Sequence, residues 1–490
     1  MSDESSRRPT EQIDRAGRPL AGPYAFVWNS SWNALVLQLA VLSLLILVIL
    51  PAPAGLGLPG LRAIGIFAVC FTLWITAALP FAITGLLAIS LIALYRVLPA
   101  HEAFALFGNT AVFFILGAFI LAAAIMKSGL SKRAALWLLA RFGHGPRTLI
   151  SGVFLIAFTL SLFMSEHAVA AALLPVILEL VEAAEETKAP RAREYGRGLL
   201  FALVWGTVIG GTGTMLGGAR APLALGILKR NSGDALGFFD YSRAVFPVTC
   251  AMGLIGATIL ILRFGGARVP ITHLREALHE QTAELGPMRS QERGIALVFA
   301  LTVAAWIALG RQIDLATIAI LSAVSLFVFR LVKWEDTEEY VNWGILLMYG
   351  GAIALGTAFS GSGAAGWMAG HFLGWTSGHP LLLLASLSLL AAILTEGMSS
   401  AAVVALLLPL GLGMLGGTGI GGPAVAIAVA LAAGLVYIFP TGAPAVALVL
   451  TSKRLTIRDM VLTGLPMSIL SWILMLLAMR FYWPKIGLLP

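Results

Sequence analysis

Two ionisable side chains interrupt an apolar segment at residues 164–175, MSEHAVAAALLP, where Glu166 and His167 are adjacent. A carboxylate and an imidazole at such a place can bind a cation or relay a proton, but burying them is costly unless they have partners. Arg220 follows in a second interrupted segment, where its guanidinium could pair with Glu166 or hold an anion. The residue types therefore point to the binding of small ions, and no nucleophile and base pair with workable spacing indicates an enzyme.

The elements that position these residues must be membrane helices, because 59% of the 490 residues are apolar and only 11% are charged. The mean hydropathy is +0.92, which is typical of a polytopic membrane protein. Apolar segments long enough to cross a bilayer leave room for about 11 spans. The net charge of +8 does not indicate nucleic-acid binding, because no basic cluster alternates with aromatic residues. The lipid bilayer is the expected surrounding.

Hydropathy predicts an all-α fold in which two apolar segments, 148–182 and 381–413, are too long for one span and are broken midway by polar residues. We expect both to form re-entrant helical hairpins. The linkers 128–143 and 360–376 are amphipathic and are expected to lie along the membrane surface. The predicted spans are 33–50, 61–79, 81–98, 110–127, 198–216, 243–263, 293–310, 314–332, 341–359, 421–439 and 461–482.

Lysine and arginine predict the orientation, because cytoplasmic loops collect them. With the N-terminus inside, the cytoplasmic segments hold 23 of the 32 basic residues, and the external loops 51–60, 360–380 and 414–420 hold none. Residues 1–32 then form a cytoplasmic tail before an uncleaved first span. The first hairpin opens to the cytoplasm and the second to the exterior. The C-terminus lies outside a cell inner (plasma) membrane.

An internal repeat supports this topology. Residues 164–175 match residues 398–409, MSSAAVVALLLP, at eight of twelve positions with an offset of 234, and Pro222 and Pro444 share an offset of 222. Two related halves that face opposite ways form an inverted repeat, as in many secondary transporters. The predicted division is a first helix and loop at 33–60, repeat 1 at 61–290 and repeat 2 at 291–490.

Each repeat combines a polar hairpin tip with a helix broken by glycine or proline, at 206–222 and 439–444. Unwound backbone can bind a small cation, and the half-helix that follows points its amide end at an anion. The glycine-rich run is not a nucleotide loop, so no cofactor is expected and sodium is the candidate cation. The substrate candidates are Ser165, Glu166, His167, Gly218, Arg220, Ser399, Ser400, Thr441 and Gly442, and the cation candidates are Ser165, Glu166, Gly210, Gly211, Thr395, Ser399 and Ala443.

Two interpretations of these charges stay open at this point. Glu166 and Arg220 either form an ion pair that only fixes the hairpin, or Arg220 helps to hold an anion while Glu166 or His167 binds a coupling ion or a proton. His167 alone could equally be a packing residue. Glu396, near the second tip, could simply cap or orient its hairpin.

Six stretches of the sequence resemble those of one known family: TAALPFAITGLLA (76–88), VFFILGAFILAAAIMKSGLSKRAAL (112–136), VIGGTGTMLGGARAP (208–222), VNWGILLMYGGAIAL (341–355), ILTEGMSSAAVVALLLP (393–409) and FPTGAPAVAL (439–448). On these stretches the chain resembles the divalent anion:sodium symporter family of the ion transporter superfamily over almost all of its length after residue 60. The resemblance implies a homodimer with a fixed scaffold and a transport domain that moves as an elevator. It also implies co-transport of sodium with dicarboxylates, tricarboxylates or sulfate.

The tips depart from the family signature of Ser-Asn-Thr, since this chain has Ser165-Glu166-His167 at one tip and Ser399-Ser400-Ala401 at the other. A carboxylate beside a dianion must be paired or protonated. Glu166 could pair with Arg220, take a proton with His167 as relay, or coordinate the cation directly. We expect anion transport with altered coupling. The alternative is a sodium/proton antiporter of the same superfamily that has no organic substrate.

Overall fold

The computed structural model describes residues 30–76, 78–142, 144–233, 236–267, 269–270, 282–283, 285–310, 312–338, 341–372, 379–415, 419–440 and 442–490. Every regular element in these ranges is helical, which confirms the all-α prediction. Eight of the described helices are long and apolar enough to cross a membrane. Each hairpin has one arm among the shorter apolar helices, α7 (Pro146–Ser161) in the first and α19 (Ser400–Gly413) in the second. The chain is therefore a multi-pass membrane protein.

The helices of the two halves follow one another in the same order after α1 (Ser30–Ile49). The predicted repeat 1 corresponds to α2 (Leu58–Thr76), α3 (Phe81–Leu94), α4 (Ala100–Ala105), α5 (Thr110–Lys127), α6 (Leu130–Phe142), α7, α8 (Glu166–Glu186), α9 (Ala192–Gly210), α10 (Arg220–Ser232) and α11 (Phe238–Phe264). The predicted repeat 2 corresponds to α13 (Ser290–Leu309), α14 (Leu315–Val328), α15 (Trp334–Glu338), α16 (Trp343–Gly361), α17 (Ala364–Phe372), α18 (Pro380–Gly397), α19, α20 (Gly422–Ala432), α21 (Pro444–Thr451) and α22 (Ile457–Leu477).

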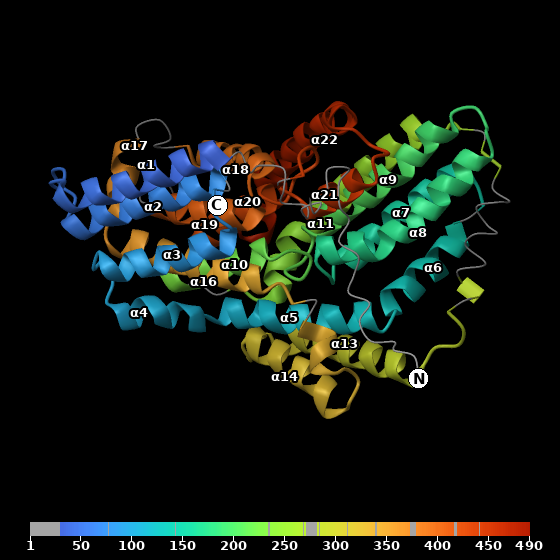
Figure 1. The fold of residues 1–490 in the computed structure, drawn as a ribbon, viewed down its shortest axis with the longest axis horizontal. Helices are drawn as coiled ribbons and strands as arrows, with labels where there is room; N and C mark the ends of the chain where they lie inside the picture. Colours follow the sequence, from blue (N-terminus) through green and yellow to red (C-terminus); the bar gives the residue numbers. More distant parts are fainter. Residues whose placement is uncertain are drawn as a thin grey trace, which may run out of the picture.

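The halves pack against each other in a crossed pattern. Helix α3 packs on α16, and its counterpart α14 packs on α5. In the same way α10 contacts α19, while its counterpart α21 contacts α8. Figure 1 shows α10, α11, α20 and α21 meeting in the middle of the molecule, with α7, α8 and α9 extending together to one side. Each helix that follows a break therefore lies against the hairpin of the other half.

Both hairpins are helix–turn–helix units, as the interrupted hydropathy predicts. Helices α7 and α8 are separated only by residues 162–165, and α18 and α19 only by residues 398–399. Ser165 caps α8, since its hydroxyl accepts from the Ala168 amide at 3.3 Å. A serine cap satisfies one of the free amides of the first turn, which explains why a polar tip restarts the helix.

Both broken helices end earlier than the predicted spans 198–216 and 421–439. Helix α9 stops at Gly210 and α20 stops at Ala432. In the first break, the Thr212 hydroxyl donates to the Ile209 carbonyl at 2.7 Å and so competes with helical bonding. In the second, the amides of residues 437–439 donate to the Glu396 carboxylate instead of to a helix. The end of α9 falls inside the break predicted at 206–222, whereas the end of α20 was missed because the unwound residues 433–438 are mostly apolar.

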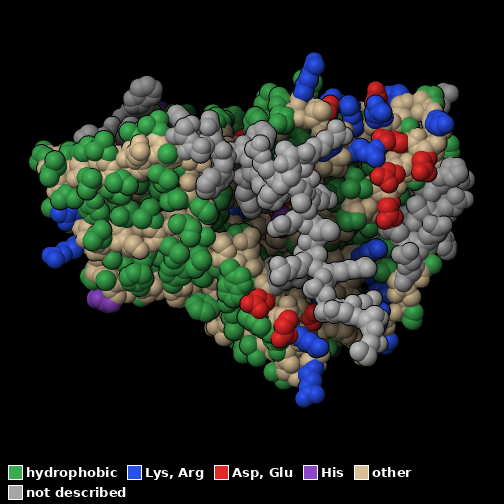
Figure 2. All heavy atoms as spheres, in the orientation of Figure 1, with side chains coloured by type: hydrophobic (Ala, Val, Ile, Leu, Met, Phe, Trp, Pro, Cys, Tyr) green, Lys and Arg blue, Asp and Glu red, His purple; other side chains and the backbone are tan. Residues whose placement is uncertain are grey.

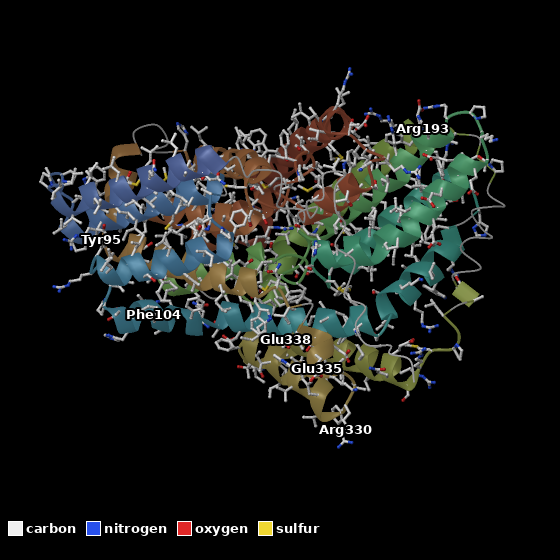
Figure 3. All side chains as sticks on the ribbon, in the orientation of Figure 1. Tyr95, Phe104, Arg193, Arg330, Glu335 and Glu338 are labelled. Atoms are coloured by element: carbon white, nitrogen blue, oxygen red, sulfur yellow. The ribbon has the colours of Figure 1, made fainter. Side chains whose placement is uncertain are left out.

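The surface separates an apolar region from charged ends. Figure 2 shows hydrophobic side chains over the left half of the molecule, and Lys, Arg, Asp and Glu gathered at the right-hand end and the lower edge. Arg193 lies at that right-hand end, and Arg330, Glu335 and Glu338 lie along the lower edge (Figure 3). Tyr95 and Phe104 lie at the opposite end (Figure 3). An apolar surface bounded by charge is what a bilayer requires.

Candidate functional site at the hairpin tips

The first tip contains a buried ion pair that joins the hairpin to the broken helix. Glu166 Oε1 lies 3.6 Å from Arg220 Nη1, and the two side chains are 10% and 2% exposed. The Glu166 amide also donates to the Gly217 carbonyl at 3.2 Å. A Cβ placed on Gly211 would lie 3.4 Å from Glu166 Oε2, so the carboxylate also lies against the start of the break. The tip and the break therefore form one unit.

The pair is only half satisfied. Within the part of the chain that the structure describes, Glu166 Oε2 and Arg220 Nη2 are buried and have no hydrogen-bond partner. A buried polar atom without a partner is unfavourable, more so when it carries charge. Oε2 can accept a hydrogen bond, and Nη2 can donate one to an anion. The first tip thus retains one free acceptor and one free donor.

Two glycines, one from each repeat, make room for the Arg220 guanidinium. A Cβ on Gly218 would lie 2.9 Å from Arg220 Cζ, and a Cβ on Gly434 would lie 2.7 Å from the same atom. Gly218 belongs to the first break, and Gly434 follows α20 at the start of the second. Because any larger residue would displace the guanidinium from either side, Arg220 is clamped at the contact between the repeats.

The second tip uses its acid differently. Glu396, at the end of α18, accepts hydrogen bonds from the backbone amides of Tyr437, Ile438 and Phe439 at 3.1, 3.2 and 2.9 Å. These amides lie in the unwound segment between α20 and α21, where no helical carbonyl is in position to accept from them. A carboxylate that accepts several amides is a strong local anchor. Glu396 therefore orients the second hairpin on its broken helix.

The remaining candidates differ in accessibility. His167 is exposed, whereas Ser165, Ser399 and Ser400 are half-buried. Gly218, Gly442 and Ala443 are buried in the breaks, as are Gly210 and Gly211. Thr441 lies outside the described residues.

Several candidate groups are already hydrogen-bonded. The Thr395 hydroxyl donates to the Ala391 carbonyl at 2.6 Å. The Gly210 carbonyl accepts from the Gly213 amide at 3.0 Å, and the Ala443 carbonyl accepts from the Val446 amide at 3.0 Å. No hydrogen bond joins Ser165 or His167 to Ser399 or Ser400 in the described ranges. The structure therefore brings each tip to its own break, and it connects the two sites through Arg220 and Gly434.

The sequence interpretation missed Ser161 and Gly434. Ser161 is fully buried at the end of α7, and its hydroxyl has no partner among the described residues. It stands 234 residues before the predicted candidate Thr395, so the repeat itself could have identified it. Nothing in the apolar stretch around Gly434 distinguishes that glycine, because its role depends on a side chain 214 residues away.

Comparison with known proteins identifies the family. A family model described as the sodium:sulfate symporter transmembrane region matches residues 29–489. The chain belongs to this symporter family. It is also 26% identical over 458 residues to the sodium-dependent dicarboxylate transporter SdcS of Staphylococcus aureus, covering 88% of each chain. Family membership supports a secondary active anion transporter.

Two solved structures share the fold of this chain. The Neisseria gonorrhoeae protein MtrF, described as an antimetabolite efflux pump, aligns over 92% of this chain and 94% of its own with a TM-score of 0.55 and 14% identity. The Alcanivorax borkumensis transporter YdaH aligns over 88% of this chain and 100% of its own, with a TM-score of 0.52 and 15% identity. At these identities the likeness concerns the fold alone, and it supports the helical transporter architecture.

Proposed function

We propose that the symporter carries a small dianion of the dicarboxylate, tricarboxylate or sulfate class, together with sodium, through a site between the two hairpin tips. The observation that supports this most is the clamped Arg220, whose Nη2 is buried without a partner where the two breaks meet. An arginine with an open donor favours oxyanions. The dicarboxylate transporter SdcS, a relative over most of both chains, supports the same substrate class.

The half-buried tips supply the other contacts in this proposal. Helices α8 and α19 both begin at the tips, so their amide ends favour a negative group placed between them. The hydroxyls of Ser165, Ser399 and Ser400 offer neutral donors to the anion or oxygen ligands to sodium. The pairing with Arg220 resolves the position of Glu166, because the guanidinium offsets the carboxylate charge beside a dianion. Proton relay through the exposed His167 is then unnecessary.

Alternating access would follow from motion of the two hairpins and their broken helices as one body, an elevator, against the remaining helices of a homodimer. The crossed contacts of α10 with α19 and of α21 with α8 support a single moving unit. We infer the orientation from the basic loops, with the N-terminus in the cytoplasm and the C-terminus outside.

Anion counterflow in proteoliposomes tests the proposal. Vesicles loaded with unlabelled succinate, citrate or sulfate should accumulate the labelled form of at least one of them, and the accumulation should depend on sodium at both pH 6 and pH 8. Vesicles without protein are the control. Sodium/proton exchange without counterflow of any of these anions would replace the proposal with the antiporter alternative. A melting-temperature screen against the same anions, with and without sodium, would identify the ligand independently.

A further inference from the structure

The two hairpin tips are related by sequence but are filled in opposite ways. The offset of 234 places Ser400 opposite Glu166, and the offset of 222 places Gly442 opposite Arg220. The first tip therefore holds a carboxylate and a guanidinium at the positions where the second tip holds a hydroxyl and no side chain. One tip has an internal positive charge, whereas the other has no cationic side chain at the corresponding position.

The positive charge of the first tip is fixed in place. Arg220 is 2% exposed, contacts Glu166, and lies between Gly218 and Gly434. Broken helices of transporters commonly hold a mobile cation against unwound backbone. A mobile cation bound to Glu166 here would have to lie next to the guanidinium and would be repelled by it.

We propose that Arg220 is a tethered cation that takes the place of a coupling ion in repeat 1. Each chain would then bind a single sodium ion, at the tip of repeat 2, and this inference rests on the proposed function. The ligands of that ion are the Ser399 and Ser400 hydroxyls and the backbone of the second break. The open Nη2 of the tethered cation faces the anion instead of a second sodium.

Equilibrium binding of ²²Na⁺ to the purified protein tests the number of sites. The wild type should bind one ion per chain, and the double variant Ser399→Ala/Ser400→Ala should bind none. Arg220→Gly, which copies the residue at position 442, frees Glu166 and should raise the number to two. The variant Glu166→Ser/Arg220→Gly copies the second tip in both positions and should also bind two ions.

Size-exclusion chromatography and a melting curve show which variants fold. If Arg220→Gly does not fold, the serine double variant still decides the question, because sodium retained by it would overturn the proposal. Two ions or none in the wild type would overturn it as well, and so would a folded Arg220→Gly protein that binds only one ion.

Anion counterflow by the wild type separates this proposal from the proposed function. Expected sodium numbers without anion counterflow would leave the tethered cation in place and reject the anion substrate. Counterflow together with two sodium ions in the wild type would support the anion substrate and reject the tethered cation.

Discussion

The two hairpin tips match each other in sequence, yet they attach to their broken helices by different chemistry. In repeat 1, the Leu162 carbonyl accepts from the Thr214 hydroxyl, and the Glu166 amide donates to the Gly217 carbonyl. In repeat 2, the residue equivalent to Leu162 is Glu396, whose carboxylate accepts three backbone amides. Neutral hydrogen bonds and the Glu166–Arg220 ion pair hold the first tip to its break, whereas a single carboxylate that accepts backbone amides holds the second.

The difference teaches that the position of an acid within the tip decides its role. Glu396 precedes the tip and accepts hydrogen bonds from the amides of the unwound backbone, so its charge has a structural role. Glu166 follows the tip, reaches a side chain, and keeps one oxygen without a partner. The charge that is anchored is structural, and the charge that retains an unpaired atom is the candidate for transport.

Arg220→Ala should have the largest effect, because it leaves the buried Glu166 without its counter-charge. Breaking a buried pair costs about 3–5 kcal/mol, so the melting temperature should fall sharply and anion counterflow should be lost. Lys229→Ala is the matched control, since Lys229, whose side chain is 50% exposed, pairs at 3.0 Å with Asp314, and such an exposed pair contributes about 0–1 kcal/mol. Equal losses in the two variants would show that burial of the first pair is unimportant.

Glu396→Ala should destabilise the protein by about 1.5–3 kcal/mol, the range for hydrogen bonds to a charged group. The folded fraction should keep the sodium and pH dependence of the wild type, because this acid only anchors the break. Thermal unfolding and counterflow at several sodium concentrations measure the two effects.

Glu166→Gln provides the comparison. It removes the charge that offsets Arg220, so it should alter the dependence of uptake on anion concentration in reconstituted vesicles. A change of ion dependence in Glu396→Ala, or an unchanged anion dependence in Glu166→Gln, would reverse the roles assigned to the two acids.

Gly218→Ala should cost about 1–3 kcal/mol, because the added methyl group overlaps the guanidinium. The three neighbours that this Cβ would meet all belong to Arg220, so the effect should become small when Arg220→Gly is already present. A double-mutant cycle on melting temperature measures this coupling. Additive effects of the two substitutions would mean that Gly218 has a separate role.

The serines that begin α8 and α19 should show the smallest differences in stability. Ser165→Ala removes a helix cap and should cost about 1 kcal/mol. The Ser399 side chain makes no capping hydrogen bond, so Ser399→Ala should leave the melting temperature in sodium-free buffer almost unchanged while it weakens sodium binding. Melting curves with and without sodium distinguish the two. A sodium-independent loss in Ser399→Ala would assign it a structural role.

Much of the architecture follows from local features of the chain. The apolar spans, the two hairpins and the paired breaks depend on hydropathy and on glycine, proline and serine at particular positions, so the sequence predicted them. The helix ends were less accurate, because the unwound residues before Phe439 are apolar and resemble a helix. Glu396 was correctly considered as a residue that orients its hairpin, since it stands one turn from the tip.

The sequence by itself determined a multi-pass helical protein with a duplicated pattern of tip and break, because burial in lipid and backbone hydrogen bonding act over a few neighbouring residues. Only the tertiary structure decided which charges meet. Arg220 lies beside Glu166 because the first tip is bonded to Gly217 just before α10, and it reaches Gly434 because α10 packs on α20; no local pattern encodes either contact. Long-range contacts place the ion pair inside and leave His167 at the surface, since only packing determines which side of a helix is enclosed.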